Sequence, residues 1–334
     1  MRVQKNHFRP FGPLLGSIVV CLACITCALY AESPRVNLTP RFNAGESMVY
    51  TVETSTNTTG KAAGPIENPE TPSQASLNVD LRVRLEVLSL SNSPEGNPTL
   101  RLRATWETSR AQSSSDAVNP AAPDPAVPFA KLEGRSLEFS LAANGAITQL
   151  HGLEGVIPGG VPPTAAIMWV SSLVSGYGFP RDGIAQGRQW SAEQPMDGVP
   201  LAGLFWKTQS SFLRSEACKP AVGNSAAPPN SRAPFLGQCA VILSRLSISR
   251  HGSAHADATP PDYVHNGLRT VGTWTGSGEG LGSISLSTGL LVSATETSTQ
   301  DYDYEIRSES AGTSIHYTGK INTQTSITLL SVAQ

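Results

Sequence analysis

The sequence predicts a mainly β protein built from antiparallel sheet, with one or a few covering helices and long disordered loops. Three observations indicate this class. Residues 77–87 alternate apolar and polar side chains almost without interruption, which is the period of a strand with one buried face. Residues 100–106 repeat the alternation. Asn144-Gly145 separates two apolar segments, and both residues tolerate the positive φ of a hairpin turn.

Further strands are expected where β-branched and aromatic residues gather between turn-forming residues. In chain order they are residues 48–54, 137–141, 147–150, 205–213, 240–248, 268–274, 284–287, 290–295, 302–308 and 314–330. Segments rich in Ser, Ala, Pro, Asn and Gly bury little apolar surface, so they are expected to form mobile loops. These are residues 57–75, 111–128, 219–234 and 252–261.

One helix is expected over residues 164–175, after a run of Pro and Gly residues. Thr164 can cap its start. Its apolar residues gather on one face and its flanks: Ile167, Met168, Val170, Leu173 and Val174. The helix either packs on the sheet or forms a lid or membrane-touching element, and packing is the preferred interpretation.

A weak internal repeat predicts two related β units. An apolar residue, a Gly turn and an aromatic residue follow one another in residues 42–50 and again in residues 184–190. Similar hairpin patterns occupy residues 139–147 and 284–291. The expected division is a first unit over residues 32–178, ending with the helix, and a second over residues 179–334. Chance similarity between amphipathic hairpins is the alternative explanation.

Residues 1–31 are expected to form a secretory signal peptide. Basic residues precede an uncharged, apolar stretch that ends in small residues. This order predicts an extracytoplasmic location, periplasmic or secreted, and a mature chain that spans no membrane. Two alternatives stay open. The uncharged stretch has about the 20 residues that span a bilayer, so it could remain as an anchor. Cys21, Cys24 and Cys27 lie where a bacterial lipoprotein cysteine would lie.

Charge and cysteine usage narrow the classes of partner. The net charge is −2 and no basic stripe is present, which excludes nucleic acid as an expected partner. Cys218 and Cys239 are the cysteines that follow the signal, and in an oxidising compartment they are predicted to pair as a disulfide.

Motifs of known catalytic chemistry are absent from the sequence, which predicts a protein that is not an enzyme and uses no cofactor. The strongest metal-ligand candidates are His251, His255, His265, Asp257 and Asp262. Glycine and prolines among them favour a solvated loop, so no metal site is expected.

Two further patterns have competing explanations. Asp301, Asp303 and Glu305 alternate with tyrosines, which favours a soluble strand face over a calcium site. Glycines alternate over residues 276–282, which favours a bent strand or flexible hairpin over a nucleotide loop.

The opening Phe42…Gly45…Tyr50, the alternating strands and the hairpin of residues 139–147 resemble bacterial envelope proteins with a lipoprotein-carrier-like (LolA-like) fold. Residues 179–190 resemble uncharacterised secreted proteins of the same build. The resemblance implies a strongly curved antiparallel sheet with helices on its concave side, and some members of that family carry acyl chains in the cavity. None of that family's binding residues can be transferred to this sequence.

The expected function is therefore non-catalytic binding of a lipid or other hydrophobic ligand, in a groove between sheet and helix. Trp169 is the residue expected to contact the ligand, together with its apolar helix neighbours Ile167, Val170, Leu173 and Val174. A structural or protein-interaction module of the cell envelope is the first alternative, with another envelope protein as its partner. A hydrolase of envelope polymers is the second alternative.

Overall fold

The computed structural model describes the strands and the segments that join several of them. The described residues are 35–64, 73–92, 98–116, 124–142, 147–152, 156, 170, 173–174, 179–180, 182–196, 199–219, 237–251, 257–308 and 310–333. Residues 1–31, where a signal peptide is expected, lie outside this part of the chain.

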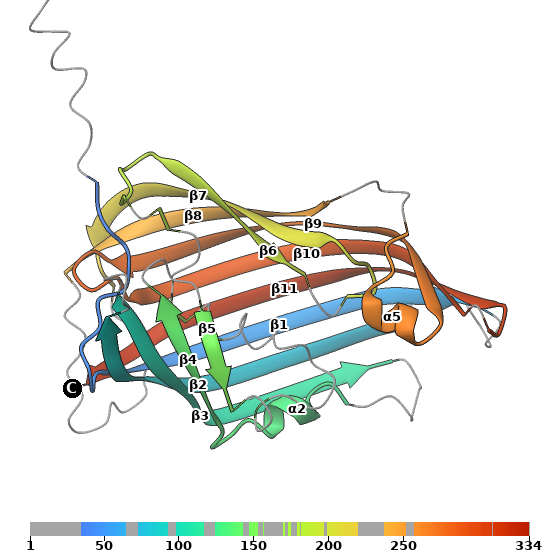
Figure 1. Cartoon of the computed structure of the whole chain (residues 1–334), viewed down its shortest axis with the longest axis horizontal. Helices are drawn as coiled ribbons and strands as arrows, with labels where there is room; N and C mark the ends of the chain where they lie inside the picture. Colours follow the sequence, from blue (N-terminus) through green and yellow to red (C-terminus); the bar gives the residue numbers. More distant parts are fainter. Residues whose placement is uncertain are drawn as a thin grey trace, which may run out of the picture.

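Eleven strands form one antiparallel sheet, which confirms the expected fold class (Figure 1). The strands are β1 (Ser47–Ala63), β2 (Ser73–Asn92), β3 (Pro98–Ser115), β4 (Ser136–Ala142), β5 (Ile147–His151), β6 (Gln189–Pro195), β7 (Leu204–Ala217), β8 (Gln238–Arg250), β9 (Leu268–Ser285), β10 (Leu291–Ser308) and β11 (Thr313–Ala333). Their spatial order is β5-β4-β3-β2-β1-β11-β10-β9-β8-β7-β6, and the sheet is not closed. The first and last strands, β1 and β11, therefore meet at its centre.

Two short helices accompany the sheet in the described residues, α2 (Val127–Ala130) and α5 (Pro261–His265). α2 contacts β3, and α5 contacts β9 toward the right end of the strands in Figure 1. Neither these nor any other described helix has the length and apolar character needed to cross a membrane.

Several strands are longer than the sequence predicts. β9 and β10 each run unbroken for 18 residues, although each was expected as two short strands. β1 continues to Ala63 and β3 continues to Ser115. The prediction of loops over residues 57–63 and 111–115 was therefore wrong. Both neighbours of β1 are long and pair with it over most of its length. Ladder pairing with two partners thus overrides the weak strand preference of Gly, Ser and Asn in these segments.

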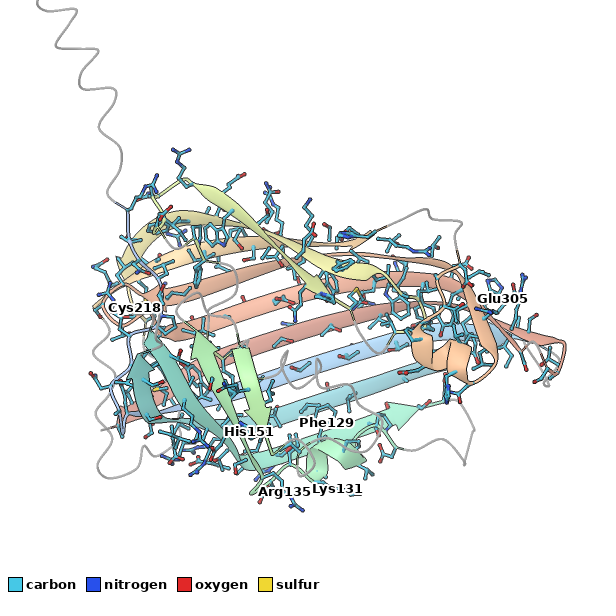
Figure 2. All side chains as sticks on the ribbon, viewed as in Figure 1. Phe129, Lys131, Arg135, His151, Cys218 and Glu305 are labelled. Carbon is cyan, nitrogen blue, oxygen red and sulfur yellow. A yellow bond between two sulfur atoms is a disulfide. The ribbon has the colours of Figure 1, made fainter. Side chains whose placement is uncertain are left out.

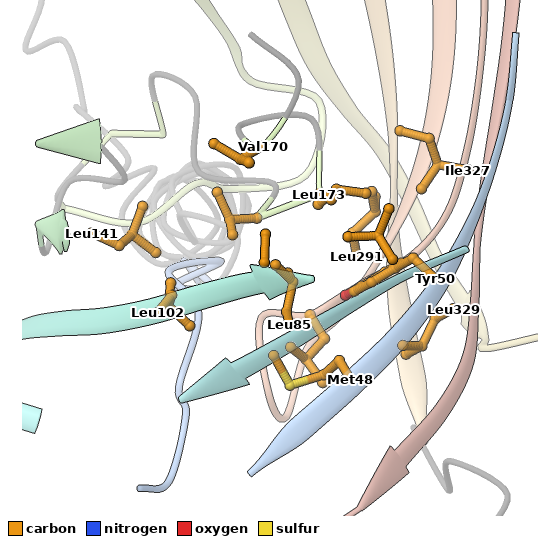
Figure 3. Packing of buried hydrophobic residues seen from close by; sticks show 14 of the residues in the cluster. Met48, Tyr50, Leu85, Leu102, Leu141, Val170, Leu173, Leu291, Ile327 and Leu329 are labelled. Carbon is orange, nitrogen blue, oxygen red and sulfur yellow. The ribbon is translucent and has the colours of Figure 1, made fainter. Parts of the chain in front are cut away.

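The main core lies on one face of the sheet, which we call the inner face. Period-two alternation places large apolar residues of each strand there. They include Met48, Tyr50, Leu85, Leu102, Phe139, Ile327 and Leu329. Figure 3 shows the strands curving around these side chains, with Val170 and Leu173 packed against them. The curvature lets one sheet enclose much of its own core.

The outer face carries paired charges instead. Arg82 and Arg84 of β2 contact Glu107 of β3, with 2.9 Å between Arg82 Nε and Glu107. Arg101 and Arg103 contact Glu138 of β4 at 2.6 and 2.7 Å. Hydrogen bonds from Arg103 and Arg101 hold the pKa of the Glu138 carboxyl below its usual range. Each exposed pair of this kind contributes little, between about 0 and 1 kcal/mol, so the pattern mainly keeps this face soluble.

The two turns of the proposed repeat have the same geometry. Gly45 and Gly187 both have positive φ, at 84° and 80°. The Gly45 N–H donates to Val87 O at 2.9 Å, and the Gly187 N–H donates to Phe212 O at 2.7 Å. The return bonds also correspond, since Val87 N–H donates to Glu46 O and Phe212 N–H donates to Arg188 O. The division into two related units stays a prediction.

A disulfide joins Cys218 at the end of β7 to Cys239 at the start of β8, as predicted. The bond is compatible with an extracytoplasmic location. Cys218 packs against the main core. It lies at the end of the sheet opposite the end that carries Glu305 (Figure 2). Cys239 is buried and belongs to the main core.

Replacing both Cys218 and Cys239 by Ala is expected to lower the free energy of unfolding by about 3 kcal/mol. The two residues are 21 positions apart, and opening this loop raises the entropy of the unfolded chain. Urea denaturation of the variant, compared with the wild type in reductant, checks the value. A loss below about 1 kcal/mol in both samples would contradict it.

Candidate functional site

A row of glycines hollows the inner face along β9. Gly276, Gly278, Gly280 and Gly282 alternate on this face, so the strand presents no side chains there. A Cβ added at Gly282 would have no atom within 4 Å, and one added at Gly280 would be 3.4 Å from Thr295 O. At Gly276 and Gly278 the space is already occupied by atoms at 2.8 and 2.6 Å. The open part of the row lies at Gly282, because Gly280 is itself buried.

Side chains of neighbouring strands wall this hollow, which we call the glycine groove. Ile242 and Ser244 of β8 stand on one side of Gly280 and Gly282, and Ala294 and Glu296 of β10 on the other. Additional apolar lining comes from Phe179, Trp190, Ile284 and Leu291. The rings of Phe179 and Trp190 are 5.7 Å apart. The walls of the groove are therefore mainly apolar, and Ser244 and Glu296 add polar groups to them.

The volume of the groove is about 190 Å³. Pockets for whole small molecules usually measure about 300–1,000 Å³. The glycine groove is therefore too small to enclose a whole molecule of that kind.

Hydroxyl groups line part of the groove and continue along the inner face. Ser210 and Ser244 share a hydrogen bond of 2.9 Å between β7 and β8. Thr54 of β1 and Thr325 of β11 lie 3.3 Å apart through their hydroxyl oxygens. These pairs satisfy one another and carry no charge, so this part of the face is polar but neutral.

Glu296 interrupts the neutrality of this face. In register, it is flanked by Gly280 of β9 and Thr325 of β11. A Cβ built at Gly280 would lie 3.6 Å from Glu296 Cγ, so the Glu296 side chain stands directly beside the glycine row. Water reaches the carboxylate, but the curved sheet surrounds it, and this desolvation raises the pKa of Glu296 above its usual range.

Charges are otherwise almost absent from the inner face. Strand register over the described residues places two charged side chains there, Glu296 and, at the far end of β8, Arg250. The acidic residues of the outer face, in contrast, commonly have cationic partners. Lys320 lies 3.3 Å from Asp301, and Arg307 lies 2.6 Å from Glu305. The strand residues of the inner face are thus mostly uncharged, and Glu296 is the charged residue beside the glycine groove.

An aromatic cluster closes the other end of the inner face. Trp274, Tyr302, Tyr304 and Tyr317 have ring centroids 5.1–6.0 Å apart between neighbours. The Tyr302 ring lies over Gly60 and Gly319, where any added side chain would overlap it. Burial and the neighbouring tyrosines raise the pKa of Tyr304 to about 12. Trp274 and Tyr304 also pack against buried Leu201 and Leu204, so this cluster is a second core.

The residues that the sequence predicts as ligand contacts fall into two groups. Trp169 and Ile167 lie outside the described residues. Val170, Leu173 and Val174 are buried in the main core, with exposures of 0, 3 and 2%. Figure 3 shows Val170 and Leu173 facing the core side chains of the strands. These three residues therefore pack on the sheet, which is the preferred interpretation of their segment.

Two of the metal-ligand candidates, His251 and Asp257, have other partners. His251 stacks on Phe205 at 4.1 Å and lies 3.4 Å from Glu193. Asp257 accepts a hydrogen bond from the Thr259 N–H, and hydrogen bonds to Thr259 lower its pKa. Over the residues that the structure describes, no three His, Cys, Asp or Glu side chains converge on one point. His255 lies outside those residues.

A larger hollow, of about 390 Å³, lies at the far end of β1, β10 and β11. Its lining includes Lys61, Asp301 and Lys320, and Asp301 and Lys320 pair with each other. The walls are long exposed side chains of the outer face, which do not define a fixed shape. The glycine groove is therefore the better candidate site.

Comparisons with protein-family models and with curated protein sequences find no match to this chain. The resemblance to lipoprotein carriers therefore stays a prediction, and the site has to be interpreted from its own chemistry.

Sequence reasoning missed Glu296 and Gly282 as site residues. A signal for Glu296 exists in β10, where residues 294, 298, 300, 302 and 304 are uncharged while Asp301, Asp303 and Glu305 alternate with them. Glu296 is thus in phase with the uncharged face of its strand. The glycines of residues 276–282 were identified as a strand feature, but their neighbours on β8 and β10 could not be known.

Proposed function

We propose that this protein is a non-catalytic, extracytoplasmic binding protein that holds a lipid-like ligand on the inner face of its sheet. The glycine groove anchors one part of the ligand. The apolar chain of the ligand lies against Phe179, Trp190 and Ile284, and the neutral hydroxyls of β1, β7, β8 and β11 line its path.

One observation carries this proposal. Gly280 and Gly282 leave a hollow in a face whose other strands bear side chains, and the walls of that hollow are mainly apolar. Glycine weakens a strand, because it has no side chain to pack and loses more conformational entropy on folding. Residues that fill space would stabilise the sheet better at these positions. A bound ligand explains why the space is kept open.

Filling the groove provides the test. A leucine in place of Gly282 enters open space, so it is expected to block the groove while leaving the sheet folded. Ser277→Leu is the matched control, because it adds the same side chain to the exposed outer face of β9. Native mass spectrometry of protein purified without detergent from a membrane-containing source measures the bound ligand.

The wild type and Ser277→Leu are expected to retain an extra mass of lipid size, and Gly282→Leu is expected to lose it. Trp190→Ala is expected to weaken retention, because it removes an apolar wall. A wild-type protein without added mass, before and after incubation with lipid extracts, overturns the proposal. It would then favour a structural or protein-interaction module of the cell envelope.

A further inference from the structure

The Glu296 carboxylate has no hydrogen-bond or ion-pair partner among the described residues, although it stands on an otherwise neutral face. Its neighbours in register, Gly280 and Thr325, supply no positive charge. The Thr325 hydroxyl lies within hydrogen-bond distance of Thr54. Glu296 is thus an accessible carboxylate without a charged partner on an otherwise neutral part of the sheet.

The position of Glu296 also fits contact with a ligand. The side chain forms part of the lining of the glycine groove and stays accessible. The neighbouring strand β9 adds no side chain at Gly280 or Gly282, and the open space lies at Gly282, where a Cβ would have no atom within 4 Å. A compact head group above Gly282 would lie in the same groove as the carboxylate. Apolar lining from Trp190, Phe179 and Ile284 continues from the same groove and suits an attached chain.

We propose that the ligand is a cationic amphiphile whose ammonium group pairs with Glu296 in the glycine groove. This inference rests on the proposed ligand-binding function and specifies the chemical class of the ligand. The net charge of the whole chain is only −2, so general attraction of cations is weak. Selectivity for a positive head group has to come from this one carboxylate, while the apolar walls hold the chain.

Three probes with the same chain separate charge from hydrophobicity: dodecyltrimethylammonium, dodecyl sulfate and dodecanol, used below the concentrations at which they form micelles. Isothermal titration calorimetry on the full mature chain measures their affinities. The wild type is expected to prefer the ammonium probe over the other two by about tenfold or more, the effect of one charge-assisted contact.

Glu296→Gln is expected to abolish this preference and leave dodecanol binding unchanged. Glu279→Gln is the matched control, since it removes the same charge from an exposed residue on the outer face of the neighbouring strand β9. This variant is expected to keep the preference for the ammonium probe. Thermal unfolding of each variant shows that it is folded.

The pH dependence provides an independent readout. Dodecyltrimethylammonium keeps its charge at every pH, so any change in its affinity reports on the protein. No titratable side chain faces Glu296 in register from β9 or β11, where Gly280 and Thr325 lie. The affinity of dodecyltrimethylammonium for the wild type is expected to fall as the pH decreases through the raised pKa of Glu296. Its affinity for Glu296→Gln is expected to be independent of pH.

The outcomes distinguish the two proposals. Equal affinity for all three probes, unchanged in Glu296→Gln but lost in Gly282→Leu, overturns the ammonium inference and leaves the binding function intact. Loss of all three probes in Glu296→Gln also overturns it, because the effect is then not selective for charge. Failure of every probe to bind the wild type overturns both proposals.

Discussion

Deletion of residues 313–333 is expected to leave a chain that does not fold. These residues form β11, which lies between β1 and β10 at the centre of the sheet. Their loss removes the ladders on both sides and takes Ile327 and Leu329 out of the core. Domains are stable by only about 5–15 kcal/mol, and the loss of two ladders and part of the core exceeds such a margin.

Circular dichroism and urea denaturation of the truncated chain measure this effect. The expected result is the loss of the cooperative unfolding transition that the full chain shows. A synthetic peptide of residues 313–333, added in trans, is expected to restore part of the β signal, and a scrambled peptide of the same composition is the control. A truncated chain that still unfolds cooperatively would contradict the prediction and favour two units that fold independently.

Replacement of Phe139 by Ala is expected to lower the free energy of unfolding by about 3–5 kcal/mol. Phe139 is fully buried in β4, opposite Leu102 of β3 and between the inner-face residues Leu137 and Leu141. Truncation leaves a cavity that this part of the sheet cannot close, because β4 is held by β3 on one side and β5 on the other.

Urea denaturation with an unchanged m-value checks the Phe139 variant. Leu281→Ala is the control, because Leu281 is 44% exposed on the outer face of β9, and its effect is expected to stay within about 0.5 kcal/mol. A Phe139 variant as stable as this control would contradict the placement of the main core.

Alternation predicted which residues of the first strands face inward. Leu85, Leu102 and Phe139 are buried as expected, because strict period-two patterns have one stable placement on a half-buried sheet. The disulfide was also predictable, since two cysteines follow the expected signal. By contrast, the full length of β9 and β10 was hidden by their Gly, Ser and Thr residues, whose strand state depends on long neighbours.

The candidate site was predicted less well than the fold. A single amphipathic segment is visible in the sequence, so its apolar residues were predicted as ligand contacts. Of these, Val170, Leu173 and Val174 pack into the core. Glu296 and Gly282 acquire meaning only when β8, β9 and β10 stand side by side. Those pairings set the site, and the order of the strands is a property of the whole chain.

The central place of β11 has a consequence for how the chain is made. Polypeptides emerge with the N-terminus first, yet Thr54 meets its partner Thr325 across 271 residues of sequence. Until the final strand arrives, β1 and β10 expose unpaired edges, which other chains can join. The sheet therefore stays incomplete until β11 has been made. Protection of the two waiting edges is then a requirement for correct folding of this chain.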